Sequence, residues 1–235
     1  MSNKTQFDHN HSLSRRGFLG VVAAASLYAL LPPASSSSLI TINEPAMRAF
    51  MIRRYGNGGL RTLNSWLALL DSAKAYAEIE QLKVVNDYFN REVQWVDDIY
   101  NWGEADYWAT PLETLAKGQG DCEDYSIGKY ISLLLLGVAN AKLRLIYVQA
   151  QFAGRSQAHM VLGYYSSPTA EPLILDNINP RLTPSSLRTD LSPVFSFNIQ
   201  GLWIGGSQES AADPTARLSR WRNVLVRMRD EGFIL

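Results

Sequence analysis

The chain has 235 residues, and its 22 basic and 22 acidic side chains give a formal net charge of zero. Its single cysteine excludes a scaffold held by internal disulfides. The charge balance does not fit a strongly basic nucleic-acid-binding protein, while the length allows one domain with a sizeable core.

Residues 1–34 have the pattern of a twin-arginine export signal. The run Ser14-Arg15-Arg16-Gly17-Phe18-Leu19 precedes an uncharged segment, Gly20 to Leu31, and the small-residue zone Pro32-Pro33-Ala34. The uncharged segment is shorter than the roughly 20 residues of a membrane span, although an uncleaved anchor is the alternative. Removing this leader takes away three basic residues and one acidic residue, which leaves a net charge near −2 and again argues against a nucleic-acid partner. We predict one domain over residues 35–235.

The first part of this domain is predicted to be helical from Glu44 to about Val93. Pro45 suits a first helical turn, and a cluster of glycines from Gly56 to Gly59 interrupts the pattern. A second helix is expected from about Ser72 to Glu92. The aromatic stretch Trp95 to Trp108 is expected to be irregular structure packed on the core.

A central helix is the strongest signal in the chain. A short helical turn begins at Pro111 and Glu113 and ends at Gly118 and Gly120. The following apolar residues then recur on one helical stripe: Ile127, Tyr130, Ile131, Leu134, Leu135 and Val138. Asp121 is a good cap for this helix, so Cys122 is predicted in its first turn.

After the helix, the apolar period changes to two. Strands are expected at Leu143–Ala150, Ala158–Tyr165, Pro172–Ile178 and Phe195–Ile204, with a turn at Ala153-Gly154-Arg155-Ser156. A last helix is expected after the cap Asp213 and Pro214, with the buried residues Leu218, Trp221, Leu225 and Met228. Its arginines, Arg217, Arg220, Arg227 and Arg229, are expected to form a solvated face.

The candidate chemistry depends on Cys122, His159 and Asp176. A thiol at a helix N-terminus is expected to have a lowered pKa, a histidine is its natural base, and a carboxylate can fix the histidine tautomer. The other histidines, His9 and His11, lie in the predicted leader. Each residue also has an ordinary structural explanation, as a small buried thiol, a hydrogen-bonded strand histidine and a turn aspartate.

These residues also carry a family resemblance. The runs Gly120-Asp121-Cys122-Glu123-Asp124-Tyr125, Ala158-His159-Met160-Val161 and Leu175-Asp176-Asn177 resemble the bacterial transglutaminase-like cysteine proteinases, specifically the LapG-type periplasmic proteases that release biofilm adhesins. The similarity extends back through Trp108-Ala109-Thr110-Pro111-Leu112-Glu113. It implies an α+β, papain/transglutaminase-like core, in which N-terminal helices and the central helix pack on an antiparallel sheet.

The resemblance also implies roles and partners. Cys122 is then the nucleophile, His159 the general base and acid, and Asp176 the orienting carboxylate. The implied substrate is a large surface adhesin, cut near its N-terminus at an Ala-Ala type site. The implied inhibitor is an inner-membrane receptor for cyclic di-GMP, and the implied compartment is the periplasm.

Calcium is a further implication of the resemblance. Asp121, Glu123 and Asp124 provide the oxygen ligands that a hard cation prefers. The alternative is that acidic groups in a first helical turn simply stabilise the helix, by about 0.3–1 kcal/mol each. The backbone N–H of Cys122 is a candidate oxyanion donor, and a second donor is expected near Trp102 to Trp108.

Two other functional classes stay open. An acyl-transferring transglutaminase or an amidase could use the same three residues, because both reactions pass through an acylated thiol. A non-catalytic peptide-binding module is the second alternative, although such a module has no physical need for Cys122, His159 and Asp176 together.

Overall fold

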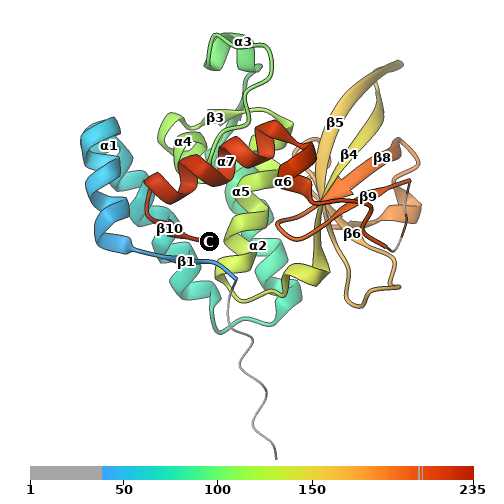
Figure 1. Cartoon of the computed structure of the whole chain (residues 1–235), viewed down its shortest axis with the longest axis horizontal. Helices are drawn as coiled ribbons and strands as arrows, with labels where there is room; N and C mark the ends of the chain where they lie inside the picture. Colours follow the sequence, from blue (N-terminus) through green and yellow to red (C-terminus); the bar gives the residue numbers. More distant parts are fainter. Residues whose placement is uncertain (1–38, 206, 208) are drawn as a thin grey trace, which may run out of the picture. The chain divides into compact units, whose positions relative to one another are not determined.

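The computed structural model describes residues 39–205, 207 and 209–235. The predicted export signal, with His9 and His11, lies outside the described residues. Helices and a six-stranded antiparallel sheet dominate the described chain (Figure 1). None of the described helices combines the length and the apolar character that a membrane crossing requires.

The first two helices confirm the N-terminal prediction except at one boundary. Helix α1 spans Glu44–Ala73, and its dihedral angles leave the helical region at Gly56 (φ 63°, ψ −156°), where the sequence predicted a break. Helix α2 spans Glu78–Glu92 instead of starting near Ser72. That start was wrong because the apolar spacing of α1 continues to the buried Ala73 before the chain turns.

The segment between α2 and the cysteine is more regular than predicted. Strand β2 (Gln94–Trp95) pairs in parallel with β3 (Gln119–Gly120), and α3 spans Asp98–Asn101 between them. The expectation that this stretch packs on the core is wrong for Trp95 and Tyr100, which are 53% and 82% exposed.

Helix α4 spans Pro111–Lys117, as the sequence predicted. The Thr110 side chain accepts from the backbone N–H of Glu113, and the Glu113 carboxylate accepts from that of Thr110, which forms a capping box. Gly118 ends the helix in the left-handed region, with φ 63°.

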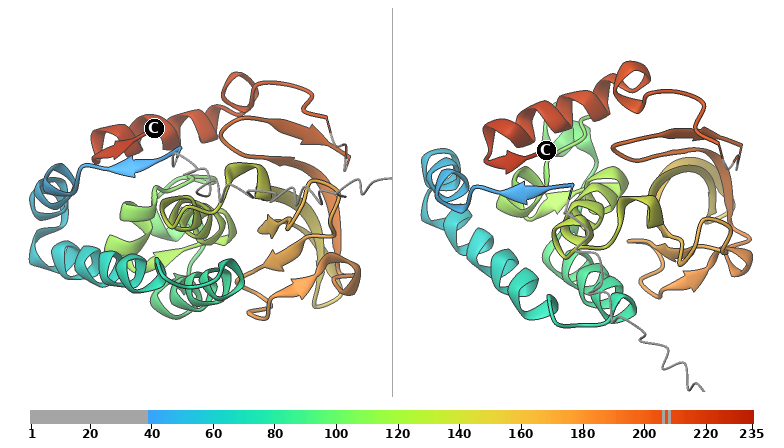
Figure 2. Two further views of the ribbon diagram at one scale, coloured as in Figure 1. Left: turned by 90° about the horizontal axis from the view of Figure 1, so that it is seen from below. Right: turned by 60° about the horizontal axis from the view of Figure 1, so that its bottom comes forward.

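Helix α5, Cys122–Leu135, lies at the centre of the described chain. In Figure 2 it runs between α1 and α2 on one side and α7 (Ser219–Asp230) on the other, with the sheet along a third side. Trp66 of α1 donates to the Ser132 hydroxyl at 2.9 Å, and Tyr130 contacts the Trp221 ring edge-on at 6.0 Å. The residues of the predicted apolar stripe are buried except for the half-buried Leu135, but the helix is buried on its other faces as well, and Val138 lies beyond its end.

The main sheet has the strand order β7-β6-β5-β4-β8-β9. Its bounds are Leu143–Phe152 for β4, Arg155–Tyr164 for β5, Leu173–Leu175 for β6, Thr183–Pro184 for β7, Leu191–Phe197 for β8 and Leu202–Ile204 for β9. Short 3₁₀ turns, η1 (Asn140–Lys142) and η2 (Ser185–Leu187), precede β4 and follow β7. The β4–β5 hairpin turns at Ala153 and Gly154, with φ 50° and 77°.

The single strand predicted over Phe195–Ile204 is wrong. The chain reverses between β8 and β9, where the Asn198 side chain accepts from the backbone N–H groups of Gln200 and Gly201. An asparagine that bonds two residues ahead favours a turn over a strand, so Asn198 and Gly201 carry the missed signal.

The C-terminal segment is helical as predicted, but it forms two helices separated at the half-buried Leu218. The predicted arginine face is exposed at Arg217, Arg220 and Arg229 and half-buried at Arg227. Helix α6 spans Pro214–Arg217, the Asp213 side chain accepts from the backbone N–H of Thr215, and α7 follows. Arg220 forms a 2.9 Å ion pair with Asp106, and Arg227 donates to the Trp108 carbonyl and lies 4.4 Å from the Tyr107 ring. Two of these arginines therefore bind the segment that precedes α4.

The ends of the described chain are paired. Strand β1 (Thr41–Ile42) is antiparallel to β10 (Phe233–Ile234), and the backbone N–H of Asn43 donates to the Gly232 carbonyl at 2.7 Å. Figure 1 shows this small sheet beside α7.

We predict that Gly128→Ala destabilises the fold, because the added Cβ lies 2.2 Å from a ring carbon of the fully buried Phe89. Overpacking of this kind lowers the free energy of unfolding by about 1–3 kcal/mol. Gly58→Ala is the matched control: its Cβ meets only the Arg61 side chain, at 3.9 Å, and alanine favours the helix. Urea unfolding measures both, and equal stability of the two variants would contradict the packing argument.

Candidate active site

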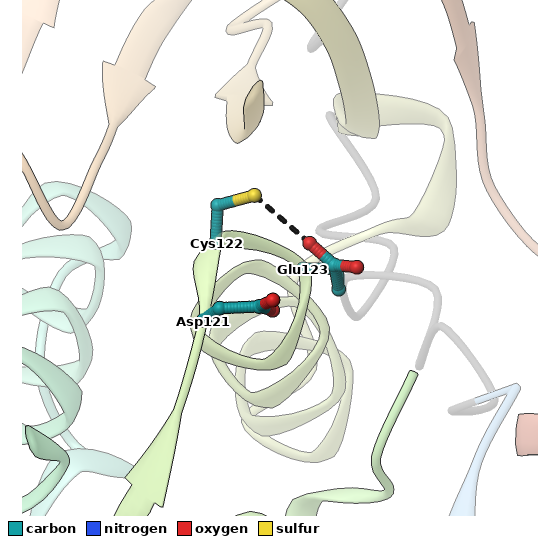
Figure 3. A group of neighbouring side chains, drawn as sticks. All are labelled: Asp121, Cys122 and Glu123. Carbon is teal, nitrogen blue, oxygen red and sulfur yellow. Dashed lines mark hydrogen bonds between the residues drawn. The ribbon is translucent and has the colours of Figure 1, made fainter. Parts of the chain in front are cut away.

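Cys122 occupies the first position of α5, where it is half-buried. Asp121 takes the N-cap position, as predicted, but its side chain makes no capping hydrogen bond, so the expected cap is right in position only. Figure 3 shows the Cys122 sulfur and the Glu123 carboxylate pointing toward each other; the thiol donates to Glu123 Oε2 at 2.8 Å.

The structure joins the other two candidate residues directly. His159 lies on β5, paired with Val148 of β4, and Asp176 directly follows β6. His159 Nε2 lies 2.9 Å from Asp176 Oδ1, and both side chains are almost fully buried. Because this bond occupies Nε2, the Nδ1 atom is the ring nitrogen left to exchange a proton with a thiol.

Cys122 and His159 line the same cavity, which has a volume of about 1210 Å³. The Cys122 thiol donates its hydrogen bond to Glu123 in this structure and not to His159. Large apolar side chains line the rest of it: Trp95, Trp108, Tyr147, Phe152, Met160, Ile178 and Phe195.

The pKa of the Cys122 thiol shifts opposite to the prediction. Burial raises this pKa well above its ordinary value, and the nearby charges of Glu123 and Asp121 raise it further, while the backbone N–H of Met160 lowers it. The N-terminus of a helix favours a thiolate by a modest amount. Desolvation and two adjacent carboxylates outweigh this effect when no cation balances them.

The predicted metal ligands belong to a larger acidic cluster. The cluster contains three groups of residues, and within each group the ligand atoms lie within 4.8 Å of one another. The groups are Asp121 with Cys122 and Glu123, Asp98 with Asp121 and Asp124, and Asp98 with Asp106 and Glu123. Asp98 and Asp106 were missed by the sequence analysis. The signal available for them was the density of acidic residues in the stretch between Trp95 and Trp108.

Several oxygens of this cluster lack protein partners. Asp98 Oδ1, Asp121 Oδ1 and Asp124 Oδ2 are buried and accept no hydrogen bond from the described residues. A buried carboxylate oxygen without a partner is costly. Converging hard oxygen donors are the ligand set that Ca²⁺ prefers, so these residues fit that ion.

The pKa values of these carboxylates reflect the same crowding. Burial, and then the charges of Glu123, Asp124 and Asp98, raise the pKa of Asp121 to about 10. Burial is also the main cause that raises the pKa of Asp98 to about 6 and that of Asp124 well above its ordinary range. A divalent cation would reverse these shifts, because it favours the charged form of each ligand.

Asp124 also ties the cysteine turn to the preceding segment. It is fully buried, and its Oδ1 accepts from the backbone N–H of Ala109 at 2.7 Å. A Cβ at Gly120 would lie 2.7 Å from Asp124 Oδ2, so glycine is needed for this close approach.

The second oxyanion donor expected near Trp102 to Trp108 is not identified by the geometry. The Trp108 indole N–H donates to Asp106 Oδ1 at 2.9 Å, so it is already engaged. The backbone N–H of Cys122, at the first position of α5, remains the candidate donor.

Comparison with known proteins identifies the family. The family model described as bacterial transglutaminase-like cysteine proteinase (BTLCP) matches residues 69–189. The chain therefore belongs to the bacterial transglutaminase-like cysteine proteinases. Comparison with curated proteins gives no match.

Solved structures of LapG from Legionella pneumophila resemble the chain over most of its length. The EGTA-treated form is 35% identical with a TM-score of 0.70, and the match covers 79% of this chain and 96% of that one. The calcium-bound form is 36% identical with a TM-score of 0.68, covering 77% and 97%. The predicted α+β, transglutaminase-like core is thus confirmed.

We predict that, in the presence of a chelator, the thiol of Cys122 is alkylated with an apparent pKa above the ordinary value of about 8.5. Alkylation by iodoacetamide should therefore rise through an alkaline midpoint, and the single cysteine makes the signal unambiguous. Glu123→Gln should lower the midpoint, because it removes the nearest negative charge. Glu80→Gln, on the exposed face of α2, is the control. A chelated wild-type midpoint below 8.5 would reject the burial argument.

Proposed function

We propose that this protein is a calcium-dependent cysteine endopeptidase with Cys122 as nucleophile, His159 as base and acid, and Asp176 as the residue that orients His159. The observation that carries this proposal is the placement of a helix-tip thiol in the same cavity as a bonded His159–Asp176 pair. Membership of a cysteine proteinase family supports it independently.

The three residues supply a complete acyl-transfer sequence. Cys122 gives its proton to His159, and the thiolate attacks the scissile carbonyl carbon while the Cys122 N–H donates to the developing oxyanion. His159 then protonates the departing amine. Water, deprotonated by His159, hydrolyses the thioester and restores the thiol. Asp176 keeps the imidazole oriented and stabilises its charged form.

The cavity suits a peptide better than a small molecule. Its volume of about 1210 Å³ exceeds the usual range for small ligands, roughly 300–1,000 Å³. Exposed apolar side chains at its border, Trp95 and Phe152, offer flat surfaces to an extended chain. Small residues at the cleavage point, as in an Ala-Ala type site, would let the backbone approach the half-buried sulfur.

Calcium is proposed as the ion held by Asp98, Asp121, Glu123 and Asp124, with Asp106 at the edge of the cluster. The three unpartnered oxygens support this assignment, as does a calcium-bound form of the Legionella relative. When bound, the ion supplies positive charge beside Cys122. Glu123, which accepts from the Cys122 thiol in this structure, would then also be a ligand of the ion.

The biological setting of the proposal follows from the family resemblance. The proposed substrate is the N-terminal region of a large surface adhesin, whose release would promote biofilm dispersal. The proposed inhibitor is the periplasmic domain of an inner-membrane cyclic di-GMP receptor. We propose the periplasm as the compartment, reached through the twin-arginine leader in residues 1–34.

A transglutaminase or amidase on the same scaffold is the second candidate function. It would use the same thioester, with an amine in place of water as the acceptor. Turnover without any added amine separates the protease from the transferase. A binding module is disfavoured, because Asp176 keeps a charged hydrogen bond to His159 that binding alone does not need.

We predict that Cys122→Ala and His159→Ala abolish cleavage of a recombinant N-terminal adhesin segment, because no other cysteine is present and His159 is the one histidine among the described residues. Asp176→Asn should lower kcat by about 10²–10⁴-fold, through loss of the orienting charge. Asp71→Asn, on the exposed surface of α1, is the control and should keep the full rate. Cleavage by Cys122→Ala at the wild-type rate would reject the mechanism.

We predict that chelation abolishes cleavage and that calcium restores it, whereas magnesium restores it poorly because it demands a tighter octahedral shell. Calcium should also raise the melting temperature, because it binds only the folded cluster.

The Asp98→Asn variant tests the ligand set most sharply. It should need more calcium for half-maximal activity, because it loses one buried ligand. The neighbouring Asp97→Asn is the matched control, since Asp97 is exposed and lies outside the three ligand groups. Chelator-resistant activity of the wild type would reject the role of calcium, and equal calcium dependence of the two variants would remove Asp98 from the site.

A further inference from the structure

Arg188 is a buried cation that has no part in the reaction steps proposed above. It directly follows the 3₁₀ turn η2, and its side chain is only 4% exposed. Burying a guanidinium is strongly unfavourable unless it is paired and hydrogen-bonded. Its partners therefore indicate what it does in the fold.

Two carboxylates share Arg188. Its Nη2 donates to Asp176 Oδ2 at 2.7 Å and to Asp190 Oδ2 at 2.7 Å, and its Nε donates to Asp190 Oδ1 at 2.9 Å. The side chain of Asp190 is 42% exposed, so it reaches Arg188 from the solvent side. A two-point contact with Asp190 fixes the plane of the guanidinium, and that plane directs Nη2 at Asp176.

The two oxygens of Asp176 have different partners. Oδ1 lies 2.9 Å from His159 Nε2 and accepts from the backbone N–H of Ile178 at 3.1 Å. Oδ2 accepts from Arg188. The backbone is held separately, since the Asn90 side chain of α2 donates to the Asp176 carbonyl at 2.9 Å. Arg188 is thus the side chain that determines which carboxylate oxygen faces the imidazole.

We propose that Arg188, held by Asp190, is a positioning residue that binds Asp176 Oδ2 and thereby keeps Oδ1 on His159 Nε2 and Nδ1 available to Cys122. The proposal rests on the proposed function for its catalytic consequence. Its structural part, the control of the His159 tautomer, holds whatever the substrate is.

The charges around Asp176 come from several elements. His159 of β5 and Arg188 contact it directly, Lys129 of α5 acts on it at longer range, and Asp190 faces it across Arg188. Asp87 of α2 acts in turn on Lys129. Burial alone would raise the pKa of Asp176, but His159, the Ile178 N–H and Arg188 lower it to about 2. Asp176 is therefore ionised at neutral pH.

Lys129 does not duplicate the role of Arg188. It is 1% exposed, and its Nζ has no hydrogen-bond partner among the described residues. Burial lowers the pKa of Lys129 to about 7, so it carries only part of a positive charge at neutral pH, and it makes no directional contact with either oxygen of Asp176. Of these two cationic side chains, only Arg188 therefore orients Asp176, and orientation is the property to measure.

A double-mutant cycle tests whether Arg188 acts through Asp176. Arg188→Met should lower kcat for the adhesin segment by about 10–100-fold, the usual cost of losing an outer partner of a catalytic group, with little change in KM. In the Asp176→Asn background the same substitution should cost less than about threefold, because its target is gone. Equal costs in both backgrounds would overturn the proposal.

The histidine tautomer gives a readout that needs no substrate. In the full chain with His9→Gln and His11→Gln, His159 is the single histidine, so its ¹⁵N signals are unambiguous. Neutral His159 should carry its proton on Nε2 in the parent, and Arg188→Met should shift it toward a mixture of tautomers. Arg181→Met, at an exposed arginine between β6 and β7, should leave the signals unchanged.

Two milder variants test the proposal if Arg188→Met does not fold. Arg188→Lys keeps a cation and should give an intermediate tautomer shift, and Asp190→Asn should give a smaller shift in the same direction by loosening the guanidinium. Parent-like signals in both folded variants would overturn the proposal. In one outcome, the parent shows the Nε2 tautomer and the variants lose it, but the parent cuts no adhesin segment. That result would reject the proposed substrate and support the positioning role of Arg188.

Discussion

A fully buried carboxylate, Asp124, is the constraint on which the active-site region depends. One of its oxygens accepts from the Ala109 backbone, and the other has no partner among the described residues. This group fixes the distance between the cysteine turn and the segment before α4, and it requires glycine at position 120. Cys122, the cavity wall at Trp108 and the acidic cluster are therefore positioned together, so a change in the charge of the cluster acts on all three.

Two networks of buried charge meet at the cavity and have different tasks. The acidic cluster beside Cys122 brings several carboxyl groups together, and among the described residues its one ion-pair partner is Arg220 at Asp106. The His159 side is balanced internally, because Asp176 has Arg188 as an ion-pair partner. The pKa of the Cys122 thiol is therefore sensitive to any charge added to the cluster, whereas Asp176 on the His159 side already has a buried cationic partner.

The sequence predicted those features that depend on local pattern. The central helix α5, the helical turn that begins at Pro111 and the β4–β5 hairpin all follow from residues within a few positions of one another. Cys122, His159 and Asp176 were selected as candidates by residue type and element. Asp98, Asp106 and Arg188 could not be placed, because their roles arise from contacts made across the fold. The predicted direction of the Cys122 pKa shift was wrong for the same reason. The N-terminus of the helix can be recognised in the sequence, whereas the burial of the thiol depends on the folded structure.

The pairing of β1 with β10 has a consequence for the order of synthesis. Thr41 and Ile42 are made early and have no partner until Phe233 and Ile234 have left the ribosome. Helix α7 is also made late, yet Trp221 packs against Phe197 and Tyr130 in the centre of the molecule. The core thus closes only after α7 has been synthesised, and a shorter nascent chain exposes the faces that α7 will cover. A chain that crosses a membrane during its synthesis would therefore expose these faces, whereas a chain that folds before transport would have them covered.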